Sequence, residues 1–227
     1  MTGSAKRPNG HGAVMANRQV APPADLEYFP TPPWAARAGG ELIQRLDPGF
    51  WNCWEPACGG GHMAHGLLDF FEAGVFASDI FPYGYGAVCD FLSCEPEDYL
   101  HFDWIVTNPP FGKAAEFLRA AWPLARRGIA LLCRLQWLEG LERHQLLYED
   151  CPLSVLAPFA ERVAMTKGRW DPRASTATAY AWFVWLHPGE RQGRARPRIL
   201  PIRPGAKARL HDPSDVARFC PELSREA

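Results

Sequence analysis

Hydrophobic and polar positions follow two patterns that exchange repeatedly along this 227-residue chain after Thr31. Short continuous apolar runs bounded by turn residues indicate buried strands, whereas apolar residues at every third or fourth position indicate amphipathic helices. Strands are expected at 50–55, 75–80, 104–107, 128–134, 154–158 and 179–186. Helices are expected at 31–46, 62–72, 113–125 and 136–149. Thr31 is the expected N-cap of the first helix, and Pro32 is its expected first residue.

The alternation of strands and helices predicts the architecture. Continuous apolar strands joined through helices pair in parallel and are covered on both faces. The expected fold class is therefore α/β, with a single doubly wound, mostly parallel sheet. Because sheets of this kind bind ligands beyond the carboxyl ends of their strands, functional residues are expected directly after the strands.

Composition divides the chain into three expected parts. Residues 1–24 are rich in Pro, Gly, Ala and Asn without any period, which predicts a disordered segment. Residues 25–189 form the expected folded domain. Residues 190–227 form an expected basic tail, in which 191–210 holds seven Lys or Arg residues and no acidic residue. Such an extended tail could contact nucleic acid or could simply be solvated.

The overall composition indicates a globular protein of a reducing cytoplasm. Hydrophobic residues make up 47% of the chain and charged residues 22%, which is typical of globular domains. No apolar run reaches the length of about 18 residues that a membrane span needs, and the N-terminal region lacks the apolar segment of a secretory signal. Seven cysteines without a Cys-x-x-Cys pair argue against a disulfide framework. Cys58, His62 and His65 lack an apparent fourth ligand, so no metal is expected.

Charge is distributed unevenly, although the net charge is only −1. No Lys or Arg occurs between Arg45 and Lys113, while acidic residues are frequent there. Basic residues return after Lys113. This asymmetry suggests one cationic or hydroxyl-rich partner and one polyanionic partner, with a chance drift in composition as the alternative.

The first candidate site residues surround a glycine turn between an expected strand and an expected helix, within 54–63. Glycines allow a ligand to approach the backbone closely, although such turns also serve packing alone. Glu55 precedes the turn and suits the amino group of a methionine moiety better than a pyrophosphate. Asp79 ends the next strand, where it could accept hydrogen bonds from ribose hydroxyls or cap a turn. Asp90 and Phe91 together could bind the amino group and the face of an adenine.

The strongest signal is the sequence Asn108-Pro109-Pro110-Phe111, which directly follows the expected strand 104–107. Two prolines end the strand and fix a rigid extended turn. The Asn108 side-chain oxygen and the Pro109 carbonyl can then both accept hydrogen bonds from one planar amine. These bonds would draw the amine lone pair out of conjugation and toward a methyl donor, while Phe111 stacks on the base.

Taken together, these motifs resemble the amino-directed DNA methyltransferases, and more narrowly the prophage-type N6-adenine methyltransferases that lack a partner nuclease. The resemblance is carried by Tyr28–Pro33, Glu55–Gly61, Asp79, Asp90-Phe91 and Asn108–Phe111. It implies a seven-stranded sheet of the Rossmann-like methyltransferase type and S-adenosylmethionine as the cofactor. It also implies DNA as the partner, with direct methyl transfer to a flipped-out adenine.

The resemblance covers residues 28–186 and implies a role for each matching position. The implied cofactor-binding residues are Phe29, Thr31, Pro32, Glu55, Ala57, Cys58, Gly59, Gly61, Asp79, Ile80, Asp90, Phe91 and Asn108. The implied catalytic residues are Asn108, Pro109, Pro110 and Phe111. The turn reads Cys-Gly-Gly-Gly instead of two glycines around a single residue, which leaves open which of residues 58–61 approaches the cofactor most closely.

DNA contacts are expected from the basic second half of the chain. The candidates are Lys113, Lys167, Arg169, Trp170 and Arg173. Basic residues interleaved with an aromatic residue suit phosphate contact and stacking, whereas an ordinary solvated loop is the alternative. Because this segment is short, we expect weak sequence specificity. A homodimer would enlarge the surface that contacts DNA, and the sequence leaves monomer or homodimer open.

Some of these sequence features are also compatible with other functions. A methyltransferase acting on RNA or on a protein glutamine amide would share the chemistry, although those families usually have Tyr at the position of Phe111. N4-cytosine enzymes more often have Ser or Asp at the position of Asn108. A non-catalytic module of the same fold would not need Asn108, and a nucleotide-dependent oxidoreductase would leave 108–111 without a purpose.

Overall fold

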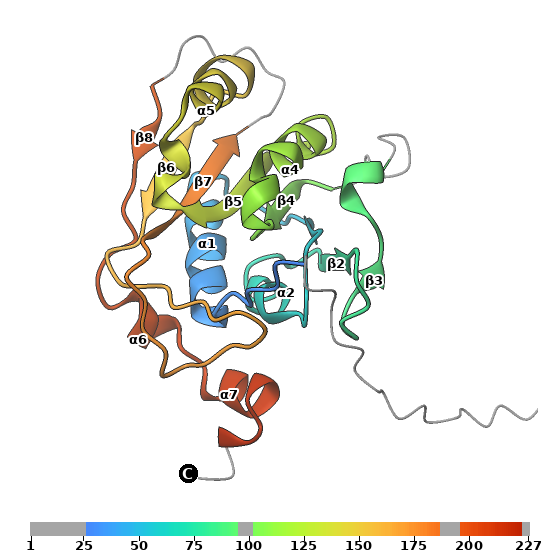
Figure 1. The fold of residues 1–227 in the computed structure, drawn as a ribbon, viewed down its shortest axis with the longest axis vertical. Helices are drawn as coiled ribbons and strands as arrows, with labels where there is room; N and C mark the ends of the chain where they lie inside the picture. The colour runs from blue at the N-terminus through green and yellow to red at the C-terminus, as the bar shows by residue number, and fades with distance from the viewer. Residues whose placement is uncertain (1–25, 95–101, 187–195, 224–227) are drawn as a thin grey trace, which may run out of the picture.

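The computed structural model describes residues 26–94, 102–186 and 196–223, and it is built around one eight-stranded sheet (Figure 1). The strand order is β3-β2-β1-β4-β5-β7-β6-β8. The strands are β1 Cys53–Glu55, β2 Val75–Asp79, β3 Ala87–Val88, β4 Trp104–Thr107, β5 Gly128–Arg134, β6 Val155–Pro158, β7 Tyr180–Leu186 and β8 Arg198–Ile199. The expected N-terminal segment 1–24 lies outside the described residues.

The pairing confirms the predicted α/β class with a mostly parallel sheet. Only β7 runs antiparallel, and it does so against both of its neighbours, β5 and β6. The sheet has eight strands, whereas the resemblance implied seven. Six of them match the six strands that the sequence pattern predicted, and the other two are the two-residue edge strands β3 and β8. Strands of two residues are defined by pairing with the neighbouring strand, so no local apolar run in the sequence predicts them.

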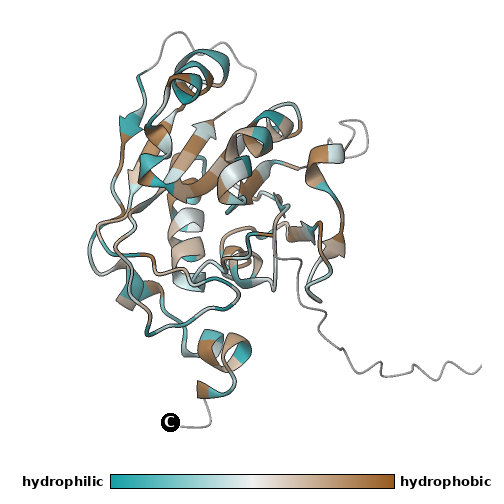
Figure 2. Cartoon of the chain, viewed as in Figure 1, coloured by the Kyte–Doolittle hydropathy of each residue, from teal (hydrophilic) through white to brown (hydrophobic). Residues whose placement is uncertain are grey.

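The central strands are buried on both faces, which is why they are continuous apolar runs in the sequence. One core lies between the sheet and α1 and α2, and the other between the sheet and α4. Figure 2 shows the hydrophobic residues concentrated in these strands. The α-helices are α1 Pro33–Leu46, α2 His62–Leu67, α4 Ala114–Ala121, α5 Leu141–Gln145, α6 Ala206–Leu210 and α7 Pro213–Phe219. None of the helices in the described ranges could span a membrane.

The first helix begins at Pro33, one residue later than expected. Pro32 is its N-cap with ψ of 128°, and Pro33 occupies its first turn. A proline disfavours helical geometry in the residue before it, so the second proline keeps Pro32 out of the helix. Thr31 is instead a buried residue ahead of the helix and makes no capping hydrogen bond.

The expected helix at 136–149 is divided into three short elements. A 3₁₀-helix η3 spans Leu135–Leu138, α5 follows, and a π-helical turn η4 spans Leu146–Asp150. Gly140 has φ of 112°, a conformation outside the helical region that separates η3 from α5. The expected helix at 62–72 is shorter than predicted and ends at Leu67.

The second half of the expected basic tail differs from the prediction, because residues 198–219 are folded onto the domain. β8 pairs in parallel with β6, and α6 packs beside α1. Ile202, Ala206 and Cys220 are buried, so the apolar residues between the basic ones anchor this segment. The basic side chains point outward and gave the sequence the character of a solvated tail.

Candidate functional site

A cavity of about 190 Å³ opens at the carboxyl edge of the sheet, where β1, β2 and β4 end. The segment 26–31 ahead of α1 forms another part of its wall. The predicted site residues that line it are Phe29, Thr31, Glu55, Ala57, Cys58, Asp79, Ile80, Asp90, Phe91, Asn108, Pro109, Pro110, Phe111 and Lys113. Pro32, Gly59 and Gly61 lie outside its wall.

The glycine turn at residues 58–61 adjoins this cavity. Gly59 and Gly61 have φ of 50° and 84°, in the left-handed region that favours glycine. A Cβ added to Gly61 would lie 2.2 Å from the Tyr85 ring. Of the four turn residues 58–61, Cys58 is the one that lines the cavity.

Asp79 ties the end of β2 to the glycine turn. Its Oδ2 accepts a hydrogen bond of 2.8 Å from the Gly59 N–H, and its Oδ1 accepts one of 3.0 Å from the Phe81 N–H. Burial raises the pKa of the carboxyl group, against the lowering effect of these backbone donors. Each carboxylate oxygen keeps a further lone pair with which it can accept a ligand hydroxyl.

Glu55 is buried at the end of β1 with one oxygen free. Its Oε1 accepts hydrogen bonds from the Thr107 hydroxyl at 2.8 Å and from the Ala57 N–H at 3.3 Å. Its Oε2 is buried without a hydrogen-bond partner. Burial raises the pKa of Glu55 to about 8, so the carboxyl group is mostly protonated at neutral pH.

Asn108 is oriented by the segment ahead of α1. Its Nδ2 donates to the Phe29 carbonyl at 3.1 Å and lies 3.6 Å from the Met165 sulfur. Its Oδ1 is buried and has no hydrogen-bond partner. The amide is thus fixed at one end and presents a buried acceptor at the other.

Buried polar atoms without a partner gather at this edge of the sheet. Over the described ranges, the four such side-chain atoms belong to Glu55, His62, Asn108 and Arg134. The first three residues line the cavity, and Arg134 lines a second cavity beside it. Because folded proteins pair nearly all buried polar groups, this gathering marks the place where a ligand supplies the missing partners.

Two aromatic residues that the sequence analysis did not assign also form the wall. The Tyr28 and Tyr83 rings stack with centroids 4.5 Å apart, and the Tyr28 hydroxyl accepts a 3.2 Å hydrogen bond from the Gly60 N–H. Burial raises the pKa of each phenol to about 12, so both stay neutral. Tyr28 directly precedes Phe29 and Tyr83 precedes Asp90, so their stacking brings two distant segments together beside the turn.

His62 begins α2 and was weighed only as a metal ligand. Its ring stacks on Phe219 of α7 with centroids 4.0 Å apart. Burial lowers its pKa to about 4, and the ring is therefore neutral at physiological pH. A contact with a residue so distant in the sequence leaves no local signal, which is why sequence reasoning missed it.

Asp90 and Phe91 line the cavity from a short 3₁₀-helix, η1 Phe91–Ser93. Asp90 caps this helix, since its carboxylate accepts from the Leu92 N–H at 3.1 Å and the Ser93 hydroxyl at 2.8 Å. Phe91 is buried and lies edge-on to Trp54 with centroids 5.0 Å apart. Both residues thus reach the cavity while also holding their own loop.

Phe111 lies between two side chains. The Phe29 ring is tilted against it with centroids 4.9 Å apart, and the Arg134 guanidinium carbon is 3.9 Å from its centroid. Arg134 was not predicted. It is the last residue of β5, so the rule that functional residues follow strand ends could have found it.

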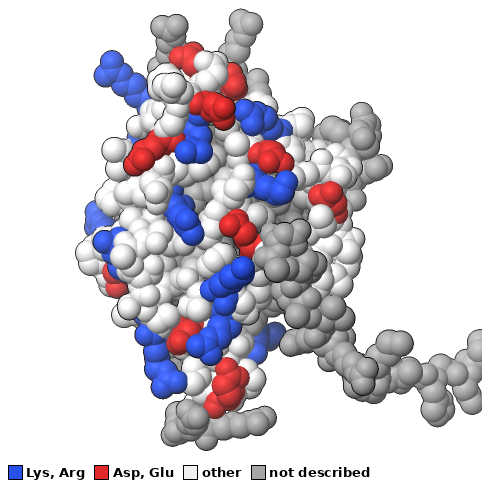
Figure 3. All heavy atoms as spheres, viewed as in Figure 1, with Lys and Arg blue, Asp and Glu red and all other residues white. Residues whose placement is uncertain are grey.

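The predicted DNA-binding residues differ in their exposure to solvent. Lys167, Arg169 and Arg173 are exposed in the loop before β7, and Lys113 is exposed with Glu116 at 3.2 Å. Figure 3 shows Lys and Arg side chains spread over the viewed face with acidic side chains between them. The described loop therefore offers several cations to solvent.

Trp170 is not available for stacking on a base, contrary to the prediction. It is only 6% exposed, and its ring lies edge-on to Phe219 of α7. The Cys220 thiol donates to its carbonyl at 3.3 Å. Hydrophobic burial under α7 outweighs exposure on the loop, and no local pattern around Trp170 predicts that α7 packs over it.

The sequence matches no protein-family model and no curated protein. In structure, the chain is similar to the type I restriction-modification methyltransferase subunit from Streptococcus thermophilus, with a TM-score of 0.55 and 12% identity. That match covers 74% of this chain and 46% of the subunit, so the chain spans about half of the subunit's length. It is also similar to a candidate RNA methyltransferase from Pyrococcus horikoshii, with a TM-score of 0.54, 14% identity and coverage of 74% and 91%.

A third similar structure is a candidate class I S-adenosylmethionine-dependent methyltransferase from Listeria monocytogenes. Its TM-score is 0.53 at 10% identity, over 86% of this chain and 69% of that one. Identities this low establish the fold and nothing finer. The chain has the Rossmann-like α/β fold of the class I methyltransferases.

Proposed function

We propose that the protein is an S-adenosylmethionine-dependent methyltransferase that methylates N6 of adenine in DNA. The polar atoms of the cavity fit this cofactor. The free Oε2 of Glu55 suits the ammonium group of the methionine part, and Asp79 suits the ribose hydroxyls. Asp90 and Phe91 would hold the adenine part. Bound there, the cofactor supplies a methyl group made electrophilic by its sulfonium charge.

Asn108 Oδ1 is the single observation that carries the proposed reaction. It is a buried acceptor without a partner, and its amide is fixed by the Phe29 carbonyl. An exocyclic amine bound there would donate one hydrogen to Oδ1 and the other to the Pro109 carbonyl. Two such bonds orient the nitrogen lone pair, and a polar group preorganised in this way acts mainly on the transition state.

Adenine in DNA is the acceptor that the remaining features favour. The motifs of the cavity resemble N6-adenine enzymes, and Phe111 follows Asn108-Pro109-Pro110 in place of the Tyr usual for RNA or glutamine-amide enzymes. A similar structure is the methyltransferase subunit of a DNA restriction-modification system. Exposed Lys167, Arg169 and Arg173 could contact phosphates, and contacts of that kind supply affinity without sequence information. We therefore propose weak sequence specificity.

RNA is the second candidate acceptor, because another similar structure is a candidate RNA methyltransferase. The experiment that separates them is incubation with methyl-labelled cofactor and separate pools of DNA, RNA and protein. Hydrolysis of the labelled product to nucleosides should give N6-methyladenine from DNA. N4-methylcytosine, label confined to RNA or protein, or no transfer at all would overturn the proposal.

The variant Asn108→Ala tests the reaction at its central atom. Methyl transfer should fall about 10²–10³-fold, because the preorganised acceptor is lost. Calorimetric titration provides the control, since S-adenosylmethionine should still bind to the variant. Turnover near that of the wild-type protein would exclude Asn108 from the reaction.

A further inference from the structure

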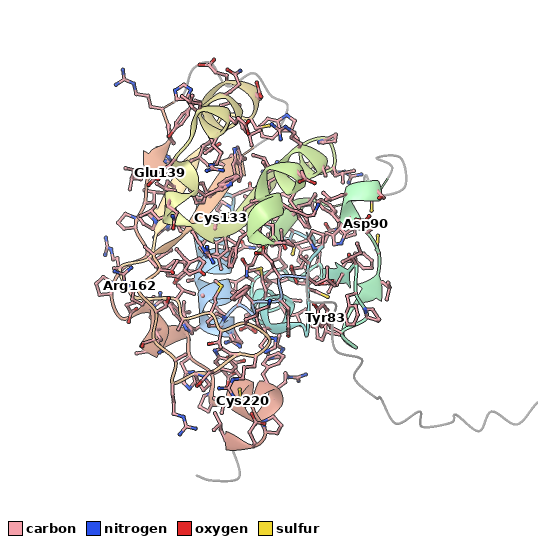
Figure 4. All side chains as sticks on the ribbon, viewed as in Figure 1. Tyr83, Asp90, Cys133, Glu139, Arg162 and Cys220 are labelled. Carbon is pink, nitrogen blue, oxygen red and sulfur yellow. The ribbon has the colours of Figure 1, made fainter. Side chains whose placement is uncertain are left out.

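A second cavity of about 240 Å³ lies beyond Phe111 and is not explained by cofactor binding. It shares Pro109 and Phe111 with the first cavity. The rest of its wall consists of Ala114, Cys133, Arg134, Gln136, Trp137, Glu139 and Arg143. Figure 4 labels Cys133 and Glu139 from this wall and Tyr83 and Asp90 from the first cavity, and the two pairs are separated in that view.

Arg134 stands at the boundary between the two cavities. Its guanidinium covers one face of Phe111, at 3.9 Å from the ring centroid. Its Nε is buried without a hydrogen-bond partner. Arg134 faces Tyr180 across the β5–β7 pair, where burial raises the pKa of that phenol more than the guanidinium lowers it. No carboxylate of the described residues lies within ion-pairing distance of Arg134, so its stacking on Phe111 is the contact that holds this cation in place.

This arrangement conflicts with the stacking of a target base on Phe111. A guanidinium and a nucleobase are both flat groups that lie on an aromatic face, and each gains a comparable interaction there. Phe29 is tilted against the same ring. A base can therefore stack on the face that Arg134 covers only if the guanidinium leaves it.

We propose that Arg134 is a positioning residue of the acceptor site, which stacks on Phe111 until the target base replaces it and then binds the phosphodiester beside that base in the second cavity. The inference rests on the proposed function and adds to it a residue that couples base entry to phosphate binding. The substrate class that satisfies both positions is a nucleotide within a strand, and not a free amine or a protein amide.

The charge of the second cavity supports a phosphate at that place. Arg134 and Arg143 are its cations, and Glu139 is its one acidic wall residue. Arg143 Nε donates to the Glu139 backbone carbonyl, which leaves the rest of its guanidinium free to donate elsewhere. A guanidinium binds a phosphate through two parallel N–H groups, and the unpaired Nε of Arg134 would supply one of them.

The salt dependence of oligonucleotide binding tests the proposal. Affinity of a short adenine-containing oligonucleotide would be measured between about 50 and 200 mM salt for the wild-type protein and Arg134→Gln. The variant should bind about tenfold more weakly or worse, and the slope of log affinity against log salt should fall by about 1. In methyl transfer, the variant should raise KM for the oligonucleotide more than it lowers kcat.

Two further variants make the result specific. Arg134→Lys keeps the charge and should keep the salt slope, whereas Arg45→Gln, an exposed cation at the end of α1, should change neither slope nor KM. Nuclear magnetic resonance follows the stacking directly. The Arg134 Nε–H resonance, identified by its absence in Arg134→Lys, should lose its ring-current shift when the oligonucleotide binds.

The outcomes separate this inference from the proposed function. If the wild-type protein methylates DNA but Arg134→Gln has an unchanged salt slope and KM, the inference is wrong and the proposed function stands. A ring-current shift that persists in the saturated complex would also overturn it. If the wild-type protein binds no oligonucleotide, both are wrong.

Discussion

Two buried oxygens, Glu55 Oε2 and Asn108 Oδ1, give the site its chemical character at the scale of single residues. A buried acceptor without a partner costs about 1–3 kcal/mol, and a folded protein keeps one only where something compensates. Both oxygens belong to residues whose other polar atom is held by the protein. They are therefore positioned before a ligand arrives. Asn108 Oδ1 suits a group that donates hydrogen, and Glu55 Oε2 does so once its carboxyl group has lost its proton.

Glu55 should make cofactor binding depend on pH. In the free protein burial raises its pKa to about 8, whereas a bound ammonium group would favour the carboxylate and lower that pKa. Binding then releases a proton, and the affinity for S-adenosylmethionine should rise as the pH is increased from about 6 to 8. Titration calorimetry at pH 7 in buffers of different ionisation enthalpy would detect the released proton.

Glu55→Gln is the matched variant for this prediction. It should bind the cofactor more weakly and lose the pH dependence. The same raised pKa makes the stability of the fold depend on pH, because the folded protein binds the Glu55 proton more tightly than the unfolded chain does. The wild-type protein should therefore lose stability relative to Glu55→Gln as the pH rises from about 4.3, the unfolded value, toward 8. Affinity that is independent of pH in the wild-type protein would contradict this role.

The place of a site residue could be predicted from the sequence where its partners lie in the same motif. It could not be predicted where the partners are distant in the sequence. Asn108 and Glu55 each follow or end a strand, so their positions at the edge of the sheet were predictable. Arg134 matters only because it meets Phe111, and His62 only because it meets Phe219. Such contacts depend on tertiary packing that leaves no periodic signal.

At the scale of elements, the link between β2 and the glycine turn makes Asp79 both a ligand group and a structural one. Asp79→Ala should reduce cofactor affinity by about 1.5–3 kcal/mol, because it removes a charged acceptor. It also leaves the Gly59 and Phe81 N–H groups without their partner. Calorimetric titration measures the affinity, and urea unfolding measures the accompanying loss of stability.

Asp79→Asn separates the two roles, since its amide keeps one oxygen for the turn but lacks the charge. Glu72→Ala, an exposed acid between α2 and β2, is the control and should alter neither quantity. Unchanged affinity in Asp79→Ala would remove Asp79 from the cofactor site.

Element prediction succeeded where burial sets the pattern. The strands β4, β5 and β7 are buried along nearly their whole length, so continuous apolar runs identify them. The two-residue strands β3 and β8 were missed because their residues are exposed and only the neighbouring strand defines them. The helix expected at 136–149 was wrong because Gly140 adopts a positive φ inside an otherwise helical pattern.

At the scale of the whole molecule, a buried ion pair fastens α7 to α1. Arg37 donates to the two oxygens of Asp215 at 2.6 and 3.1 Å, and Asp215 is 1% exposed. Asp69 accepts another hydrogen bond from Arg37, at 2.5 Å. Through this link α7 is held where Phe219 covers Trp170 and stacks on His62, so one wall of the site depends on it.

Asp215→Ala should destabilise the fold by about 3–5 kcal/mol, because it leaves a buried cation without its main partner. Urea unfolding of the two proteins measures the difference. The double variant Arg37→Met with Asp215→Leu should recover much of the loss, since apolar side chains of similar size replace the charges. A single variant as stable as the wild-type protein would show that the pair does not hold α7.

The same ion pair sets an order of events during synthesis. Arg37 and Asp215 are separated by 178 positions. At the usual rate of about 5–20 residues per second, the ribosome adds Asp215 roughly 10 to 35 seconds after Arg37. In that interval the nascent chain carries a cation that is buried only later, together with an α1 surface still lacking α6 and α7. The wall formed by Phe219 can close over His62 only after this delay, so the nascent domain cannot complete its site while the sheet is still being made.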